Sequence, residues 1–175
     1  MINPVEDLKD HIRSIPDFPK KGILFRDITT LLGNGQAFKT VVDNLKKRYE
    51  PMGIQKIVGV ESRGFILAAP LAYALGAGLV PVRKKGKLPF HTASVTYDLE
   101  YGQDTLQMHT DAIRPHEKTL IIDDLLATGG TAKATCQLVE QLEGEVAGVG
   151  FLIELTALKG RSTLGNYDIF SLIQL

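Results

Sequence analysis

Residues 119–131 read Thr-Leu-Ile-Ile-Asp-Asp-Leu-Leu-Ala-Thr-Gly-Gly-Thr, and this stretch decides the fold. Its first four residues suit a buried strand. Asp123 and Asp124 follow where a parallel strand leaves its sheet at a crevice. The Gly-Gly pair permits close approach of the backbone, and Thr131 begins a helix whose first N–H groups are unpaired. The stretch therefore predicts a strand, a loop and a helix N-terminus that attracts a phosphate.

A simpler interpretation is a strand-to-helix turn in which Asp123 caps the helix and the glycines only make the bend. The paired carboxylates, the glycines and the apolar strand occur together, which favours a ligand site. No Gly-Lys-Ser/Thr follows, as a Walker A loop requires, and Gly-x-Gly-x-x-Gly is absent from the chain. One helix end contributes only about 0.3–2 kcal/mol to anion binding. The ligand therefore needs further cations, and it should carry hydroxyl groups for the acids.

Composition narrows the class of protein. The chain has 175 residues, 44% of them hydrophobic, which suffices for one domain with a full core. Twenty basic residues balance twenty acidic ones, so we expect neither nucleic acid nor a membrane surface as a partner. One cysteine, Cys136, and four scattered histidines give no metal-ligand spacing. The first residues lack a basic and apolar leader, so we expect a cytoplasmic protein.

The N-terminal part predicts a helix followed by an extended segment. Asn3 is a suitable cap, and apolar residues at helical spacing continue the helix to Ile15. Residues 22–28 mix apolar and charged side chains. From the residues alone, a solvated edge is the favoured interpretation of this segment.

The rest of the chain predicts an α/β fold, with a mostly parallel twisted sheet flanked by helices. The expected strands span residues 56–60, 79–82, 119–122 and 146–155, with an edge strand at 168–173, and the expected helices span 38–49, 64–75 and 131–142. Residues 65–82 are apolar enough to suggest a membrane span. However, two prolines and two glycines interrupt this stretch, which favours a helix at 64–75 followed by a strand at 79–82.

Two further segments lie between these elements. Residues 83–87, Arg-Lys-Lys-Gly-Lys, are either a solvated face or a phosphate clamp at the sheet edge. Residues 88–108 predict two antiparallel arms around a Gly-containing turn. This hairpin is either a mobile lid or an ordinary surface hairpin.

Taken together, these residues resemble the type I phosphoribosyltransferases, and within them the adenine phosphoribosyltransferases, along nearly the whole chain. The strand, two acids and Thr-Gly-Gly-Thr loop match the wider group. Further matches to the adenine enzymes lie in the segments 18–19, 22–28, 61–65, 83–89 and 97–102. The combination of the central motif with residues 24–27 and 99–102 is the most specific of these matches.

The resemblance implies transfer of 5-phosphoribose from its 1-pyrophosphate to N9 of adenine, giving AMP and pyrophosphate in purine salvage. It implies Mg²⁺, carried mainly by the donor rather than by a protein metal site, and a homodimer. It also implies one phosphoribosyltransferase domain, residues 1–175, with a small hood at 1–35 and a flexible antiparallel lid at 88–108.

The resemblance assigns roles residue by residue. The 5-phosphate and ribose are held by Asp123, Asp124, Ala127, Thr128, Gly129, Gly130 and Thr131. The pyrophosphate is met by Glu61, Ser62, Arg63, Arg83, Lys87 and Tyr101, with a cis peptide between Glu61 and Ser62 and with Arg83 reaching across from the other subunit. The adenine is held by Leu24, Phe25, Arg26 and Leu155.

Glu100 is the expected catalytic residue, handling the proton of the imidazole ring of adenine. Its alternative role is a carboxylate on the surface of the lid. Two other functions remain open from sequence. One is a phosphoribosyltransferase for another base, such as xanthine or orotate. The other is a non-catalytic regulator that keeps the phosphoribosyl site as a sensor.

Overall fold

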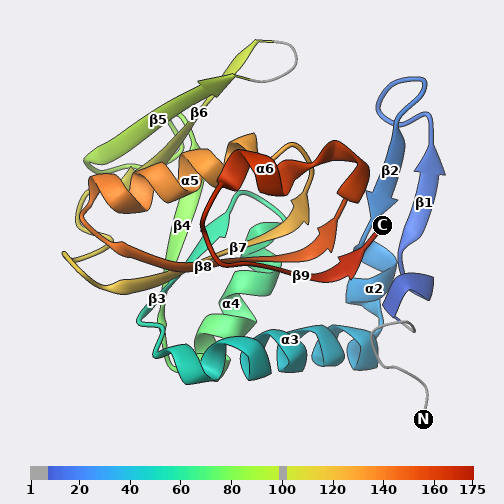
Figure 1. Cartoon of the computed structure of the whole chain (residues 1–175), viewed down its shortest axis with the longest axis horizontal. Helices are drawn as coiled ribbons and strands as arrows, with labels where there is room; N and C mark the ends of the chain where they lie inside the picture. The colour runs from blue at the N-terminus through green and yellow to red at the C-terminus, as the bar shows by residue number, and fades with distance from the viewer. Residues whose placement is uncertain (1–7, 99–101) are drawn as a thin grey trace. The chain divides into compact units, whose positions relative to one another are not determined.

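The computed structural model describes residues 8–98 and 102–175 (Figure 1). The chain forms two compact units, residues 1–44 and 45–175, each of which has its own secondary structure. The larger unit carries the motifs of the central stretch, and the smaller one carries the segment 22–28.

The larger unit is built on a seven-stranded sheet in the order β5-β6-β4-β3-β7-β8-β9. Five neighbouring strands, from β4 to β9 in that order, run parallel, whereas β6 pairs antiparallel with both β4 and β5. The predicted mostly parallel sheet is therefore confirmed. The strands are β3 (Lys56–Val60), β4 (Gly78–Lys84), β5 (Thr92–Asp98), β6 (Gln103–His109), β7 (Lys118–Leu126), β8 (Glu145–Glu154) and β9 (Ile169–Gln174).

Helices cover both faces of this sheet. Helix α4 (Gly64–Leu75) packs on one face and α5 (Gly130–Gln141) packs on the other (Figure 1). The shorter helical segments are η1 (Glu50–Met52), η2 (Thr156–Leu158) and α6 (Gly160–Leu164). This layering buries both sides of the central strands, which explains why residues 57–60 of β3 and 120–122 of β7 are apolar runs.

The order of the strands places the functional motifs at one edge. Strand β3 lies between β4 and β7. The chain runs from β3 to β4 on one side and later returns to β7 on the other side, so the direction of strand addition reverses at β3. A ligand crevice in such sheets lies at this point of reversal, beyond the carboxyl ends of the strands. The segments that follow β3, β4 and β7 all leave the sheet there.

The smaller unit contains a two-stranded antiparallel ribbon. Strand β1 (Arg13–Pro16) pairs with β2 (Leu24–Asp27), and α2 (Thr29–Gly33) follows. Phe18 packs edge-to-face on Phe25, with ring centroids 5.1 Å apart. Helix α3 (Gly35–Tyr49) begins in this unit, and its last turn belongs to the larger one.

Three sequence predictions need correction. The N-terminal helix ends at Asp10 rather than Ile15, because Ile15 instead pairs with Phe25 in the β1–β2 ladder. Strand β4 continues past Val82 through Arg83 and Lys84, since β6 pairs with these two residues. Strand β7 continues to Leu126 and so includes both aspartates, because the long strand β8 offers pairing partners as far as Glu154.

Strand β8 contains a close contact with the end of α3. A Cβ atom placed on Gly150 would lie 2.7 Å from the Tyr49 hydroxyl oxygen and 2.8 Å from Ile122 Cδ1. Tyr49 and Ile122 are both fully buried, so neither can move aside easily. On the same strand, a Cβ on Gly148 would find its nearest neighbour at 3.4 Å, which is an ordinary contact.

We therefore expect Gly150→Ala to lower the free energy of unfolding by about 1–3 kcal/mol through overpacking. Urea unfolding followed by circular dichroism measures the change. Gly148→Ala is the matched control, and it should be neutral or slightly stabilising because alanine restricts the unfolded chain. Equal effects of the two substitutions would contradict the packing argument.

Candidate active site

A cradle at the carboxyl end of β7 forms the centre of the site. We use "cradle" for residues 127–131, which connect β7 to α5. Gly129 has φ of +86°, a left-handed conformation that places it at the N-cap of α5. The cradle borders a cavity of about 80 Å³ that is also lined by Asp123 and Leu125. This is room for a group the size of two or three water molecules beside unpaired helix N–H groups.

Helix α6 closes the cradle from behind, which the sequence did not predict. A Cβ on Gly129 would lie 2.6 Å from the carbonyl oxygen of Gly160, and a Cβ on Gly160 would lie 2.3 Å from that of Ala127. The Thr163 hydroxyl donates a hydrogen bond of 2.7 Å to the carbonyl of Thr128. The cradle therefore requires glycine at two positions far apart in sequence.

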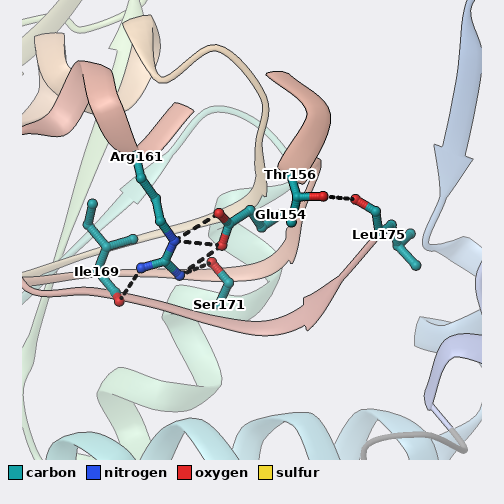
Figure 2. A network of polar contacts seen from close by, with 6 residues as sticks. All are labelled: Glu154, Thr156, Arg161, Ile169, Ser171 and Leu175. Carbon is teal, nitrogen blue, oxygen red and sulfur yellow. Dashed lines mark hydrogen bonds and ion pairs between the residues drawn. The ribbon is translucent and has the colours of Figure 1, made fainter. Parts of the chain in front are cut away.

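An ion pair between the partly exposed Arg161 and the buried Glu154 holds α6 in place (Figure 2). Arg161 donates to Glu154 through Nε, at 2.8 and 3.0 Å to the two carboxylate oxygens, and through a terminal nitrogen at 2.8 Å. The other terminal nitrogen donates to the carbonyl of Ile169 on β9 at 3.1 Å. The Arg161 guanidinium lowers the pKa of Glu154. This network ties α6 to the ends of β8 and β9.

The paired acids are brought against a cation from another motif. Arg63, which follows β3, lies 2.8 Å from an Asp124 carboxylate oxygen. Burial, and then the adjacent Asp124, raise the pKa of Asp123 well above its usual value. Burial also raises the pKa of Asp124, against the lowering effect of Arg63. A pair that resists double ionisation repels an anionic ligand less than two ordinary carboxylates would.

Glycine is also required where β7 meets α4. A Cβ on Gly64 would lie 2.9 Å from both the Asp123 carboxylate and the carbonyl oxygen of Ile122. The turn 61–64 therefore lies directly against the acids. The peptide bond between Glu61 and Ser62 in this turn is cis, as the resemblance implies.

The predicted cations gather around one carboxylate. Glu61 forms an ion pair with Lys87 and lies 3.3 Å from Arg83 Nε. The backbone N–H of Lys84 also donates to Glu61 at 3.0 Å. Burial raises the pKa of Glu61, but the hydrogen bonds from Lys87 and Lys84 and the charge of Arg83 lower it overall. Glu61 therefore holds the segment 83–87 at the edge of the site through these ion pairs and this hydrogen bond.

The predicted antiparallel arms are confirmed as β5 and β6, which pair from Thr92↔His109 to Asp98↔Gln103. Tyr97, near the end of β5, lies 3.0 Å from the Thr131 hydroxyl of the cradle. The sequence suggested no role for Tyr97. The catalytic candidate Glu100 and the pyrophosphate candidate Tyr101 lie outside the described residues.

The four residues predicted to bind the base lie in both units. Leu24, Phe25 and Arg26 form most of β2 in the smaller unit, where the Arg26 guanidinium donates to the Ser14 hydroxyl at 2.5 Å. Leu155 follows β8 in the larger unit, and its N–H donates to the carbonyl of Leu126 at 2.9 Å. Leu155 is thus positioned by the same strand end that leads into the cradle.

A larger hollow, of about 570 Å³, lies between β5 and α5, away from these motifs. It is lined by polar and exposed positions such as Ser94, Gln137 and Gln141, without a charged cluster that could bind a phosphate. Size alone therefore does not make it the site.

Comparison with known proteins identifies the family. A model of the phosphoribosyl transferase domain matches residues 27–173. Adenine phosphoribosyltransferase from Roseiflexus sp. is 58% identical over 168 residues, covering 96% of this chain and 98% of that protein. The chain belongs to the adenine phosphoribosyltransferase family. This membership makes it a glycosyltransferase of the pentosyltransferase class.

Solved structures agree with this assignment. Adenine phosphoribosyltransferase from Thermoanaerobacter pseudethanolicus has a TM-score of 0.95 at 52% identity, with 98% of this chain and 99% of that chain covered. The Saccharomyces cerevisiae enzyme, complexed with D-2,5-dideoxy-2,5-imino-altritol 1,6-bisphosphate and adenine, has a TM-score of 0.93 at 42% identity, with 98% and 99% covered. The type I phosphoribosyltransferase fold predicted from the sequence is thus confirmed.

Two observations concern metals and membranes. Within residues 8–98 and 102–175, no three His, Cys, Asp or Glu side chains are grouped to hold a metal ion. In that same part of the chain, no helix is long and apolar enough to cross a bilayer. The apolar stretch 65–82 is instead helix α4 followed by strand β4, as the sequence predicts.

We expect Arg161→Met to lower the free energy of unfolding at pH 7 by about 1–3 kcal/mol, because it leaves the buried Glu154 carboxylate without its partner. Arg161 lowers the pKa of Glu154 in the folded state. The contribution of the pair is therefore complete above the unfolded glutamate pKa of about 4.3, and it is lost as pH falls through the lower folded value. Urea titrations at pH 7 and at successively lower pH measure the gap between wild type and variant.

Lys46→Met is the matched control, because it removes an exposed ion pair with Glu50 that spans 3.5 Å. Such a pair contributes only about 0.3–0.5 kcal/mol. An Arg161→Met effect as small as that of the control, or a stability gap that widens as pH falls, would be inconsistent with a stabilising Glu154–Arg161 ion pair.

Proposed function

We propose that this chain transfers the 5-phosphoribosyl group of 5-phosphoribosyl 1-pyrophosphate to N9 of adenine, giving AMP and pyrophosphate in purine salvage. One observation carries the proposal. A glycine-dependent cradle at a helix N-terminus, with the buried Asp124 and the partly buried Asp123 beside it, lies in a chain of the adenine phosphoribosyltransferase family. The bisphosphate and adenine bound by the yeast relative support the same pair of ligand types.

The cradle binds the 5-phosphate in this proposal. The first N–H groups of α5 and the Thr128 and Thr131 hydroxyls supply donors, and the helix dipole adds a favourable potential. Asp123 and Asp124 address the ribose hydroxyls. Burial raises the pKa of both acids, and their carboxyl oxygens can accept hydrogen bonds from a diol.

The pyrophosphate lies against the segments that follow β3 and β4. Breaking the bond from C1 to pyrophosphate builds positive charge on the ribose and negative charge on the leaving group, as in glycoside cleavage. Ser62, Arg63 and Lys87 meet the leaving group, together with Tyr101 and a partner subunit's Arg83. Glu61 holds Lys87 ready near the site edge, so less reorganisation is needed when the charge develops.

Leu24, Phe25, Arg26 and Leu155 bind adenine in this proposal. Leu24 and Arg26 contribute backbone groups and Phe25 contributes an apolar wall. As the bond between N9 and C1 forms, the imidazole ring releases a proton, and the Glu100 carboxylate acts as the acceptor for it.

Magnesium fits this site as a companion of the donor. Mg²⁺ commonly takes one or two carboxylates together with substrate phosphates and waters. Asp123 and Asp124 are oxygen donors of the right kind, and no further carboxylate joins them among the described residues. When bound, the ion would neutralise part of the charge of the leaving pyrophosphate.

The remaining assignments are part of the same proposal. The chain acts as one phosphoribosyltransferase domain in the cytoplasm, with residues 1–35 as a hood over the base and 88–108 as a lid. Neither nucleic acid nor membrane is a partner. The phosphoribosyl site alone does not distinguish adenine from other bases. The assignment of adenine as the base therefore rests on the family match at β2 and Glu100.

The reaction is tested with a panel of bases and a coupled assay for pyrophosphate release. Adenine should be used about 10⁴-fold more efficiently than hypoxanthine or guanine, because a polar site built for one edge leaves groups unpaired with another. Comparable use of hypoxanthine, xanthine or orotate would move the chain to a different base. Absence of pyrophosphate release with every base, despite donor binding, would favour a sensor.

A homodimer is the assembly that we propose, with the outer face of α4 as part of the interface. Ile66 and Tyr73 lie seven residues apart on this helix, so they share one face. Their side chains are 43% and 92% exposed, and Leu79 at the start of β4 is 46% exposed. Exposed aromatic and aliphatic residues on a helix face favour contact with a second copy.

Tyr73→Glu should therefore shift the protein from dimer to monomer in sedimentation velocity at micromolar concentration, since interface aromatics often contribute 2 kcal/mol or more, roughly a 30-fold change in Kd. Leu158→Glu is the matched control, because Leu158 is 47% exposed on η2. If both variants sediment like the wild type, α4 does not form the interface. If the wild type itself is a monomer, the dimer proposal is wrong.

A further inference from the structure

Tyr97 connects the β5–β6 hairpin to the cradle. Its hydroxyl oxygen lies 3.0 Å from the Thr131 hydroxyl oxygen, across 34 positions in the sequence. Its ring lies against the glycine pair, since a Cβ on Gly130 would lie 3.4 Å from Tyr97 Cδ2. Tyr97 is half-buried, whereas most side chains at the outer end of the hairpin are exposed. This tyrosine is therefore the part of the described hairpin that lies directly on the cradle.

The direction of this hydrogen bond matters for an anion in the cradle. A hydroxyl group has one proton and two lone pairs. If Thr131 gives its proton to Tyr97, it presents lone pairs to a phosphate, which is unfavourable. If Tyr97 is the donor, the proton of Thr131 is free for a phosphate oxygen. Burial raises the pKa of Tyr97, so the phenol keeps its proton and can donate.

We propose that Tyr97 is a positioning residue for the phosphoribosyl subsite, because its hydroxyl orients the Thr131 hydroxyl toward the 5-phosphate of the ligand. This inference deepens the proposed function and rests on it. It also means that the base of the hairpin and the 5-phosphate subsite are coupled through one hydrogen bond. The cluster around Glu61 lies outside this hydrogen bond, because no hydrogen bond joins the Tyr97 hydroxyl to Glu61 within residues 8–98 and 102–175.

A second set of contacts keeps the hairpin in register at this position. Tyr97 pairs with Asp104 across the hairpin, and Asp104 forms an ion pair of 3.1 Å with Lys84 on β4. The tyrosine backbone is therefore anchored independently of its hydroxyl. Replacing the hydroxyl alone should leave the hairpin in place.

Tyr97→Phe tests the inference in the full-length protein, because it removes the hydroxyl and keeps the ring on Gly130. We expect its Kd for ribose 5-phosphate, measured by isothermal titration calorimetry, to rise about threefold to tenfold. The Kd for inorganic pyrophosphate and the melting temperature should not change. In steady-state kinetics, KM for the phosphoribosyl donor should rise by a similar factor, with KM for adenine unchanged.

Tyr167→Phe is the matched control. Its hydroxyl donates at 2.6 Å to Glu140, at the opposite end of the same helix α5. It should leave both ligand affinities unchanged.

A double-mutant cycle with Thr131→Val separates orientation of the threonine from packing. Thr131→Val alone should weaken ribose 5-phosphate more than Tyr97→Phe does, because it removes the phosphate donor itself. In the Thr131→Val background, Tyr97→Phe should have no further effect, since no hydroxyl is left to orient.

The outcomes distinguish this inference from the proposed function. An unchanged affinity in Tyr97→Phe, an equal loss in Tyr167→Phe, or an undiminished loss in the Thr131→Val background would overturn the role of Tyr97 while leaving the reaction intact. If the wild type neither binds ribose 5-phosphate nor forms AMP, the proposed function itself fails.

Discussion

The close contact between Gly129 and Gly160 is the constraint on which the site depends. With 2.6 Å from a Cβ on Gly129 to the Gly160 carbonyl, the cradle keeps its shape only if α6 stays in one position. A five-residue helix cannot hold itself there, because such short helices are marginal in isolation. The ion pair between Arg161 and the buried Glu154 fixes α6 by joining it to β8 and β9. An ion pair outside the cradle therefore maintains the shape of the cradle.

The same end of the sheet carries charges that are already paired. Arg63 faces Asp124, whereas Lys87 and Arg83 face Glu61. The local potential is consequently weaker than a count of the cations suggests, in keeping with a chain of zero net formal charge. The ion pairs instead fix the positions of these cations. Cations held by a carboxylate lose less side-chain entropy on binding an anion than free lysines and arginines would.

Much of the fold was predictable from local patterns. The strand Lys56–Val60 and the helix Gly64–Leu75 have the predicted bounds, because an apolar run ending at a polar turn is a strong local signal. The failures occurred where pairing decided the structure. Ile15 has helical spacing to its neighbours but is paired in β1, and Asp123 and Asp124 belong to a strand because β8 extends beside them. Sheet pairing between distant segments overrides local propensity.

The sequence by itself determined the chemistry of the main site. The acids, the glycine pair and the hydroxyl residues of 119–131 are close together in sequence, so their spacing predicted a ligand with a phosphate and hydroxyl groups. Their combination with distant motifs indicated the family. Only the tertiary structure decided what supports them. Gly160, Thr163 and Tyr97 are ordinary residues in sequence, and they matter because α6 and β5 are brought against the cradle by long-range packing. Such contacts have no local signature, since they join residues more than thirty positions apart.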